Sequence, residues 1–228
     1  MSTSPAHSRS ATIRIGPPWA DATAVAVLFH GRGRSAAEMR ELAHRFEVPE
    51  ISFVIPEASG GSWYPQRFTA PLADNEPALS QSLAFYAEIV DEIIAAGTRP
   101  ENIVLGGFSQ GACLTAEYIV RNPRPYGAAM IFTGGLIGPS GTRWPAAPAL
   151  RNVPIYLTGS TGDAWVPVER VEETARVFQA SGARVDLTIF DGRDHDVCDE
   201  EVAAARRMLA WWRAGNVRSR REKRRAVN

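Results

Sequence analysis

Cysteine is scarce in this chain of 228 residues, which contains only Cys113 and Cys198. Two cysteines are too few for the disulfide framework that holds small secreted proteins together. The sequence also lacks an apolar run long enough to cross a bilayer. Its first ten residues are polar and do not contain the apolar segment of a secretory signal peptide. We therefore expect a cytoplasmic protein with no stable membrane insertion.

The chain also lacks a net charge, because 25 Lys and Arg residues balance 25 Asp and Glu residues. The charges are not evenly distributed along the chain. Residues 218–228 carry six basic side chains against Glu222, a net charge of +5, which leaves −5 on the other 217 residues. Such a tail can bind nucleic acid or an anionic surface. We favour the simpler interpretation, a solvated and disordered tail over 216–228, and expect no nucleic-acid partner.

Apolar runs alternate with helical patterns through most of the chain. The expected strands are 25–29, 51–55, 103–105, 128–132, 153–157 and 185–190, and the expected helices include 77–96, 168–180 and 200–213. Largely apolar strands of the kind that are buried on both faces, separated by helices, predict an α/β fold whose mostly parallel sheet is covered by helices on both faces. We expect one domain over residues 22–215, preceded by an N-terminal segment over 1–21.

The most informative motif is Gly107-Phe108-Ser109-Gln110-Gly111, between an apolar strand and a predicted helix. A nucleophile on so sharp a strand-to-helix turn needs small residues two positions before and after it, because the backbone there is crowded. The helix that begins beneath the serine directs its N–H groups toward an anion that forms there. The motif therefore predicts a nucleophilic Ser109 in an esterase-type hydrolase.

A serine hydroxyl needs a base within hydrogen-bond reach. In hydrolases with this turn, the acid and then the histidine follow the nucleophile along the chain. Of the four histidines only His195 follows Ser109, in the loop after the last expected strand. We predict that His195 is the general base, and that His30 shapes the loop after the first expected strand instead.

The acid partner is expected at the end of the strand between the serine and the histidine. Asp163 follows the 153–157 strand and fits that place, whereas Asp186 lies inside a strand, and Asp191 and Asp194 are too close to His195 in sequence. The carboxylates around His195 raise the alternative of a metal site. A lone histidine among scattered carboxylates is a weak ligand pattern. We therefore expect no metal and no cofactor.

Acyl transfer also needs hydrogen-bond donors for the oxyanion of the tetrahedral intermediate. One expected donor is the backbone N–H of Gln110, the residue after the nucleophile. The other is the backbone N–H of Arg32, in the loop Phe29-His30-Gly31-Arg32-Gly33, whose glycines allow close approach to a substrate.

At these motifs the chain resembles the phospholipase/carboxylesterase family of α/β-hydrolases, which includes small bacterial carboxylesterases and acyl-protein thioesterases. The matching stretches are 28–33, 106–112, Gly162-Asp163 with Val166-Pro167, and Asp194-His195. The resemblance covers about residues 22–213. It implies an α/β-hydrolase fold without a large cap, and a shallow, exposed acyl groove. It also implies Ser109, Asp163 and His195 as the triad, with Arg32 and Gln110 as oxyanion donors.

Two residues depart from the pattern of that family. Arg32 stands where many members have a non-polar residue, and Asp194 stands where they have glycine. The side chains of Arg32 and Arg34 would place positive charge beside the mouth of the site, which would favour anionic or phenolic esters.

Four bulky side chains on strand-end loops are candidates to line the substrate pocket: Trp63, Tyr64, Leu136 and Trp165. Such side chains often wall a pocket, because exposing them to water is unfavourable. The alternative is that they pack their own loops against the core. Cys113, on the helix after the serine, is expected to be a buried packing residue.

The sequence thus predicts a serine carboxylesterase acting on short- or medium-chain acyl esters of small molecules through an acyl-enzyme. A thioesterase or a lysophospholipase with the same triad is the nearest alternative. More distant alternatives are hydrolysis of a lactone or a carbon–carbon bond, and a non-catalytic scaffold whose basic tail is the functional part. The sequence leaves the oligomeric state open.

Overall fold

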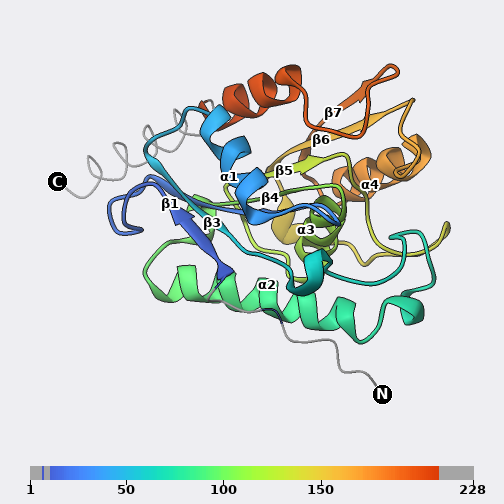
Figure 1. The fold of residues 1–228 in the computed structure, drawn as a ribbon, viewed down its shortest axis with the longest axis horizontal. Coiled ribbons are helices and arrows are strands. Elements are labelled where there is room, and N and C mark those ends of the chain that lie inside the picture. The colour runs from blue at the N-terminus through green and yellow to red at the C-terminus, as the bar shows by residue number, and fades with distance from the viewer. Residues whose placement is uncertain (1–6, 8–10, 211–228) are drawn as a thin grey trace.

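The computed structural model describes residue 7 and residues 11–210, which form a sheet flanked by helices (Figure 1). The sheet has seven strands in the order β1-β3-β2-β4-β5-β6-β7. β1 runs antiparallel to β3, and the other neighbouring strands are parallel. The strands are β1 (Ile13–Ile15), β2 (Ala24–Phe29), β3 (Ile51–Ile55), β4 (Ile103–Phe108), β5 (Ala128–Phe132), β6 (Pro154–Ser160) and β7 (Arg184–Phe190). The expected α/β fold with a mostly parallel sheet is confirmed.

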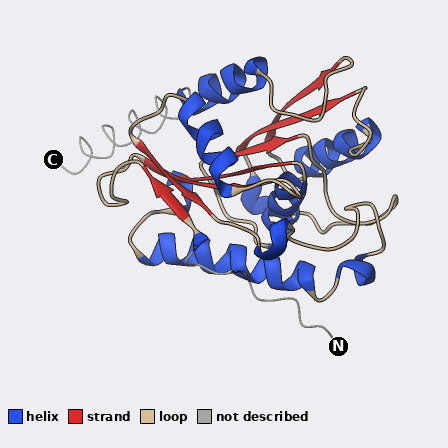
Figure 2. Ribbon diagram, viewed as in Figure 1, coloured by secondary structure: helices blue, strands red, loops and turns tan. Residues whose placement is uncertain are grey.

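The α-helices lie on the two faces of this sheet, as Figure 2 shows in blue. They are α1 (Ala36–Arg45), α2 (Ala78–Ala95), α3 (Gln110–Arg121) and α4 (Val168–Ala180), and residues 199–210 are also helical. Helix α4 has the predicted bounds, and α2 differs from its prediction by one residue at each end. The last three residues predicted for the final helix lie outside the described residues, as do the basic tail and residues 1–6 and 8–10 of the N-terminal segment.

Two apolar clusters fill the space between sheet and helices. Alternating residues of β2 point to opposite faces, as the pleat of a strand requires. Val25, Val27 and Phe29 pack with residues of α2, α3 and α4, whereas Ala24, Ala26 and Leu28 pack with α1 and the helix at 199–210. Every residue of β2 is buried, which explains why the strand is uniformly apolar.

Strand β1 was not predicted from the sequence. It pairs with β3 through only three residues, with Ile13 opposite Ile55 and Ile15 opposite Phe53. A run of three residues at a sheet edge is too short to show a reliable period of two. The sheet therefore begins with β1, earlier in the chain than residue 22, at which the continuous apolar pattern starts.

The strand order places a switch point between β2 and β4. The chain moves outward from β2 to β3, returns to form β4 on the other side of β2, and then continues in that direction through β7. In open sheets of this type, ligands bind at the carboxyl ends of strands beside such a switch point. That point in this protein lies between the loop after Phe29 and the turn at Ser109.

No inserted domain interrupts the alternation of strands and helices in the described part of the chain, so the carboxyl edge of the sheet has no large cap. Within the same residues, no helix combines the length and the apolar character needed to span a bilayer.

Candidate active site

Ser109 occupies a strained turn between β4 and α3. Its backbone has φ 53° and ψ −116°, a conformation that residues other than glycine rarely adopt. The turn is held from both sides, because the N–H of Ser109 donates to Phe132 O at 3.0 Å and its carbonyl accepts from Cys113 N at 2.9 Å. This geometry lifts the hydroxyl of Ser109 above the end of the sheet.

The two glycines of the motif allow the backbone to close around this turn. A Cβ on Gly111 would lie 2.2 Å from the carbonyl oxygen of Phe29, and a Cβ on Gly107 would lie 2.5 Å from the carbonyl carbon of Gly111. Both clashes are with backbone atoms, which cannot move aside as a flexible side chain can. The spacing Gly-x-Ser-x-Gly is therefore a packing requirement of this turn.

Gly111→Ala is accordingly expected to destabilise the fold by about 3 kcal/mol or more, because β2 and α3 must separate to admit the methyl group. Urea unfolding measures this loss. Gly141→Ala is the matched control, since Gly141 has φ 84° but no atom within 4 Å of an added Cβ. The control has only backbone strain to bear, about 1 kcal/mol. Equal losses in the two variants would contradict the packing argument.

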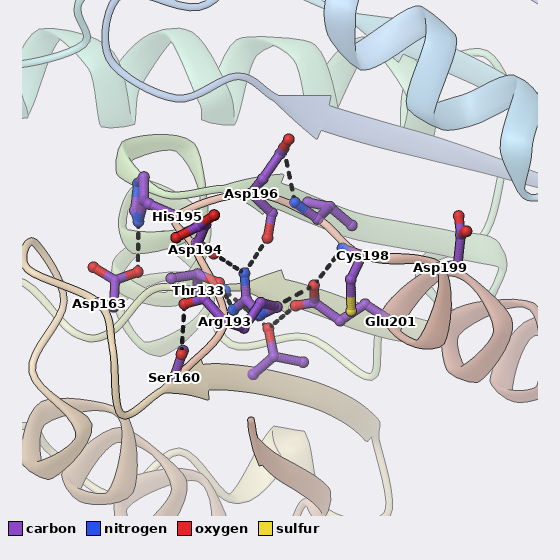
Figure 3. A network of polar contacts seen from close by, with 12 residues as sticks. Thr133, Ser160, Asp163, Arg193, Asp194, His195, Asp196, Cys198, Asp199 and Glu201 are labelled. Atoms are coloured by element: carbon purple, nitrogen blue, oxygen red, sulfur yellow. Dashed lines mark hydrogen bonds and ion pairs between the residues drawn. The ribbon is translucent and has the colours of Figure 1, made fainter. Parts of the chain in front are cut away.

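The three side chains predicted to form a triad lie within hydrogen-bond distance of one another. The Ser109 hydroxyl donates to Nε2 of His195 at 2.7 Å, and Nδ1 of His195 donates to Oδ2 of Asp163 at 2.6 Å (Figure 3 shows the second contact). They follow the carboxyl ends of β4, β7 and β6. The Asp163 side chain is fully buried, while that of His195 is 22% exposed, so the imidazole can reach a substrate.

The environment of Asp163 favours its ionised form. Burial by itself raises the pKa of this carboxyl, but hydrogen bonds from His195, Trp165 N–H and Val166 N–H outweigh burial and lower the pKa below its usual value. The two backbone groups donate to Oδ1 at 2.8 and 2.9 Å, which leaves Oδ2 for the histidine. An ionised acceptor at Oδ2 requires the proton of His195 on Nδ1, so Nε2 can accept the proton of the serine.

The predicted oxyanion donors lie on the two loops that meet at the switch point. Gln110 is the first residue of α3, where backbone N–H groups have no acceptor inside the helix. Arg32 lies in the loop after β2, and both residues line the same pocket as Ser109 and His195. The oxyanion role of these two N–H groups stays a prediction.

His30 holds the loop that carries Arg32. Its Nε2 accepts from Ala58 N–H at 2.9 Å, so its proton is on Nδ1, which donates to Gly31 O at 2.7 Å. Burial lowers the pKa of His30, and this effect exceeds the opposing influence of its bond to Gly31 and of Glu57. His30 is thus a neutral structural residue of the loop, in agreement with the sequence analysis.

The side chain of Gln110 has a role that the sequence analysis missed. Its Oε1 accepts from Trp63 N–H at 3.0 Å, and its Nε2 donates to Tyr64 O at 2.7 Å. The residue after the nucleophile therefore holds the loop over 62–64 against the start of α3. No local pattern in the sequence indicates this contact, because its partners lie 47 and 46 residues earlier in the chain.

The pocket beside Ser109 has a volume of about 400 Å³. Tyr64 and Trp165 line it, as predicted, whereas Trp63 and Leu136 do not. The full set of lining residues is Arg32, Tyr64, Pro65, Gln66, Arg67, Phe68, Ser109, Gln110, Cys113, Trp165, Val166 and His195.

The prediction that Trp63 and Leu136 line the pocket is therefore wrong, and the two side chains belong to the core. Trp63 is fully buried, donates from its indole nitrogen to His30 O at 2.8 Å, and packs on Phe29 at 4.7 Å between ring centroids. Leu136 is also fully buried, and its N–H donates to Thr174 Oγ1 at 2.9 Å. Each of the two loops folds inward because its polar backbone finds partners there.

Cys113 lies at the wall of the pocket and is not suited to be a nucleophile. The side chain is buried, as expected for a packing residue. Burial raises the pKa of the thiol to about 12. A thiol acts as a nucleophile in its thiolate form, which is scarce at neutral pH when the pKa is this high.

Arg193 holds the loop of His195 on both sides of the histidine (Figure 3). Its Nη1 donates to the carbonyl of Asp194 at 2.8 Å and also to the carbonyl of Asp196. Its Nη2 donates to Thr133 Oγ1 at 2.6 Å, just past the end of β5. One guanidinium thus links the backbone before and after His195 and ties both to the sheet.

A buried carboxylate orients this guanidinium from the other side. Glu201 is fully buried and lies 3.7 Å from Nε of Arg193. Its two oxygens accept from Thr158 Oγ1 at 2.5 Å and from Cys198 N–H at 2.8 Å. The loop of Asp163 joins the same assembly, because Ser160 Oγ donates to Arg193 O at 2.7 Å. Nothing in the sequence indicated this network.

Arg193→Met should therefore lower kcat by about 10- to 100-fold, while KM changes less than about threefold, because small misplacement of a catalytic group is costly. Steady-state ester kinetics separate the two constants. Arg176→Met is the control, since Arg176 is 65% exposed and lies 3.9 Å from its partner Glu172. An unchanged kcat in Arg193→Met would show that the loop holds His195 without the guanidinium.

The carboxylates near His195 have other partners. Asp191 accepts from Thr161 Oγ1, Asp196 from the N–H of Val197, and Asp199 from Arg45, each at 2.8 Å. Among the described residues, no group of three or more His, Cys, Asp or Glu side chains is arranged to hold a metal ion.

The known proteins that this chain resembles are hydrolases, in agreement with the geometry of the site. Residues 11–213 match the family model described as phospholipase/carboxylesterase. A solved structure of a phospholipase/carboxylesterase from Dyadobacter fermentans is 37% identical, with a TM-score of 0.84 over 89% of this chain and 97% of that chain. A probable carboxylesterase of Oryza sativa subsp. japonica is 25% identical over 85% of this chain and 78% of its own. Acyl-protein thioesterase 1 of Eremothecium gossypii is 27% identical over 83% of this chain and 88% of its own. The chain therefore belongs to the phospholipase/carboxylesterase family of α/β-hydrolases and is a serine hydrolase.

Proposed function

We propose that this chain is a carboxylesterase that uses Ser109, His195 and Asp163 as a catalytic triad. The observation that carries the proposal is the continuous pair of hydrogen bonds, 2.7 Å from Ser109 to His195 and 2.6 Å from His195 to Asp163, at the wall of an open pocket. A serine, a neutral imidazole and an ionised carboxylate in this order are the arrangement that activates a hydroxyl for attack on a carbonyl.

The proposed reaction begins when Oγ of Ser109 attacks the ester carbonyl and Nε2 of His195 takes its proton. The carbonyl oxygen becomes an oxyanion, which accepts from the N–H groups of Arg32 and Gln110. As the tetrahedral intermediate collapses, His195 gives its proton to the leaving alcohol and an acyl-enzyme remains. Water then repeats the sequence, releasing the acid and restoring the Ser109 hydroxyl.

The pocket supports short- or medium-chain acyl groups as substrates. Its volume of about 400 Å³ lies toward the small end of ligand pockets, which span roughly 300–1,000 Å³. Phe68, Trp165 and Val166 supply apolar wall, so an alkyl chain can leave water there. A thioesterase acting on the same acyl groups is the second candidate, because one relative is named an acyl-protein thioesterase.

We propose a cytoplasmic location from the two unpaired cysteines, because disulfides are rare in the reducing cytoplasm.

The test is hydrolysis of p-nitrophenyl esters from acetate to decanoate, beside oxoester and thioester pairs that share one acyl group. We expect kcat/KM to be highest between acetate and octanoate and to favour the oxoester. A maximum at decanoate would overturn the proposed chain length, and a preference for the thioester would favour the second candidate. A folded protein that hydrolyses none of these substrates would overturn the esterase proposal.

A further inference from the structure

Among the described residues, the side chains that line the pocket beside Ser109 include two with positive charge and none with negative charge. Its lining includes the guanidinium groups of Arg32 and Arg67, and it contains no aspartate or glutamate. A purely alkyl ester has no group that would interact with two cations. The lining therefore contains a feature that the proposed hydrolysis of neutral esters does not use.

The guanidinium of Arg32 is held in place by neutral partners. Its Nη1 donates to Pro65 O at 2.7 Å and its Nη2 donates to Gln66 O at 2.5 Å. Its Cζ lies 6.0 Å from the ring centroid of Tyr64. Backbone carbonyls and a ring orient the group but do not cancel its charge, and a guanidinium has five N–H donors, so it has further hydrogen bonds to offer.

Arg67 lies on the same wall, and its guanidinium lies against an aromatic ring. Its Cζ is 5.3 Å from the ring centroid of Trp165, whose side chain is 58% exposed. In the described part of the chain no carboxylate lies within ion-pair distance of Arg67. Stacking on an indole limits the freedom of the side chain and leaves its N–H edge open.

Arg32 and Arg67 differ in this respect from most of the other arginines in the described part of the chain. Ten other arginines form ion pairs with carboxylates within the described residues. Arg34 is one of them, since its Nη1 lies 3.6 Å from Glu38. It borders a different hollow and not the pocket of Ser109. Arg34 was expected beside Arg32 at the mouth of the site, and the structure places Arg67 there instead.

We propose that the substrate of this protein is an ester that carries an anionic group, a carboxylate or a phosphate, which Arg32 and Arg67 bind beside Ser109. The inference rests on the proposed esterase function and adds the substrate class. Planar guanidinium groups bind carboxylates and phosphates through paired hydrogen bonds, and an arrangement held in advance loses little freedom when the anion binds. The anionic group lies on the acyl side or on the alcohol side of the ester.

The experiment compares kcat/KM for anionic and neutral esters in matched pairs. p-Nitrophenyl hemisuccinate against p-nitrophenyl butyrate tests the acyl side, and 4-acetoxybenzoate against 4-acetoxybenzamide tests the alcohol side. In Arg67→Gln, the ratio of anionic to neutral kcat/KM for one pair should fall about fivefold to tenfold. Arg34→Gln is the matched control and should leave both ratios unchanged. In the native protein, raising the ionic strength should also lower the affected ratio.

The outcomes separate this inference from the esterase proposal. Turnover of the neutral esters that is lost in Ser109→Ala, together with ratios that Arg67→Gln does not change, would overturn the anionic substrate and leave the esterase intact. Equal falls in Arg67→Gln and Arg34→Gln would also overturn it, because a diffuse field would then act in place of a binding contact. A fall confined to the acyl-side or the alcohol-side pair supports the inference and assigns the side. Absence of turnover with every ester would overturn the esterase proposal itself.

Discussion

Replacing Ser109 with alanine is expected to lower kcat for ester hydrolysis by about 10⁵- to 10⁶-fold, because the variant retains a base and an acid with no nucleophile to activate. The Oγ that is removed is the atom 2.7 Å from Nε2 of His195. Cys113, on the same pocket wall, cannot replace it, since burial holds the pKa of its thiol at about 12. The remaining rate should reflect only binding and the oxyanion donors.

The fold of Ser109→Ala should survive, because alanine keeps the Cβ and the strained backbone of the turn changes little. Urea midpoints and far-ultraviolet circular dichroism check this expectation. Ser140→Ala, at an exposed position, is the matched control and should retain the native rate. Mass spectrometry after treatment with a fluorophosphonate offers a second measurement, with one adduct on Ser109 of the native protein and none in the variant. A pure Ser109→Ala sample within tenfold of the native rate would contradict the assignment of the nucleophile.

The arrangement of the sheet could be predicted because its determinants are local and repeated. A buried parallel strand is apolar at nearly every position, and β2 and β3 are buried throughout. A helical period follows most of these strands, although a long loop joins β5 to β6. Strand β1 lacks both signals, since its three residues pair at an edge and are only partly buried or exposed. Its position depends on a partner, β3, that lies far along the chain.

The position of the candidate site follows from topology more than from any single residue. Parallel strands bring their carboxyl ends to one edge, so Ser109, Asp163 and His195 were expected near one another although 86 residues separate the first from the last. Which side chains line the pocket could not be predicted in this way. Whether a loop aromatic turns inward depends on distant partners, and Trp63 turns inward because its indole nitrogen reaches His30 O.

The supporting contacts of the site escape sequence reasoning for the same reason. Arg193 lies two residues before His195. No local pattern in the sequence indicates that its guanidinium donates to the carbonyls on either side of that histidine. Arg67 likewise reads as an ordinary exposed arginine in a loop. Its proposed role in binding an anionic group depends on Trp165, almost one hundred residues further on, and on the absence of a neighbouring carboxylate in the described residues.

Asp163→Asn is expected to lower kcat by about 10⁴-fold with the protein still folded, because the amide selects the wrong tautomer of His195. The N–H groups of Trp165 and Val166 donate to Oδ1, so the amide oxygen should take that place and the amide NH₂ should face the histidine. Nδ1 must then accept, the ring proton moves to Nε2, and Nε2 can no longer take the proton of Ser109.

Steady-state kinetics measure this loss, with Asp74→Asn, at an exposed position, as the control that should keep the native rate. Stability gives an independent check of the ionised carboxylate. The pKa of Asp163 is lowered in the fold, so its contribution to the free energy of unfolding is complete above the ordinary value of about 3.9 and disappears as the pH falls through the lowered value. The difference in urea midpoint between native protein and Asp163→Asn should therefore shrink between pH 7 and pH 3. A variant with more than a tenth of the native kcat would show that His195 keeps its working tautomer without the carboxylate, and the proposed role of Asp163 would have to be abandoned.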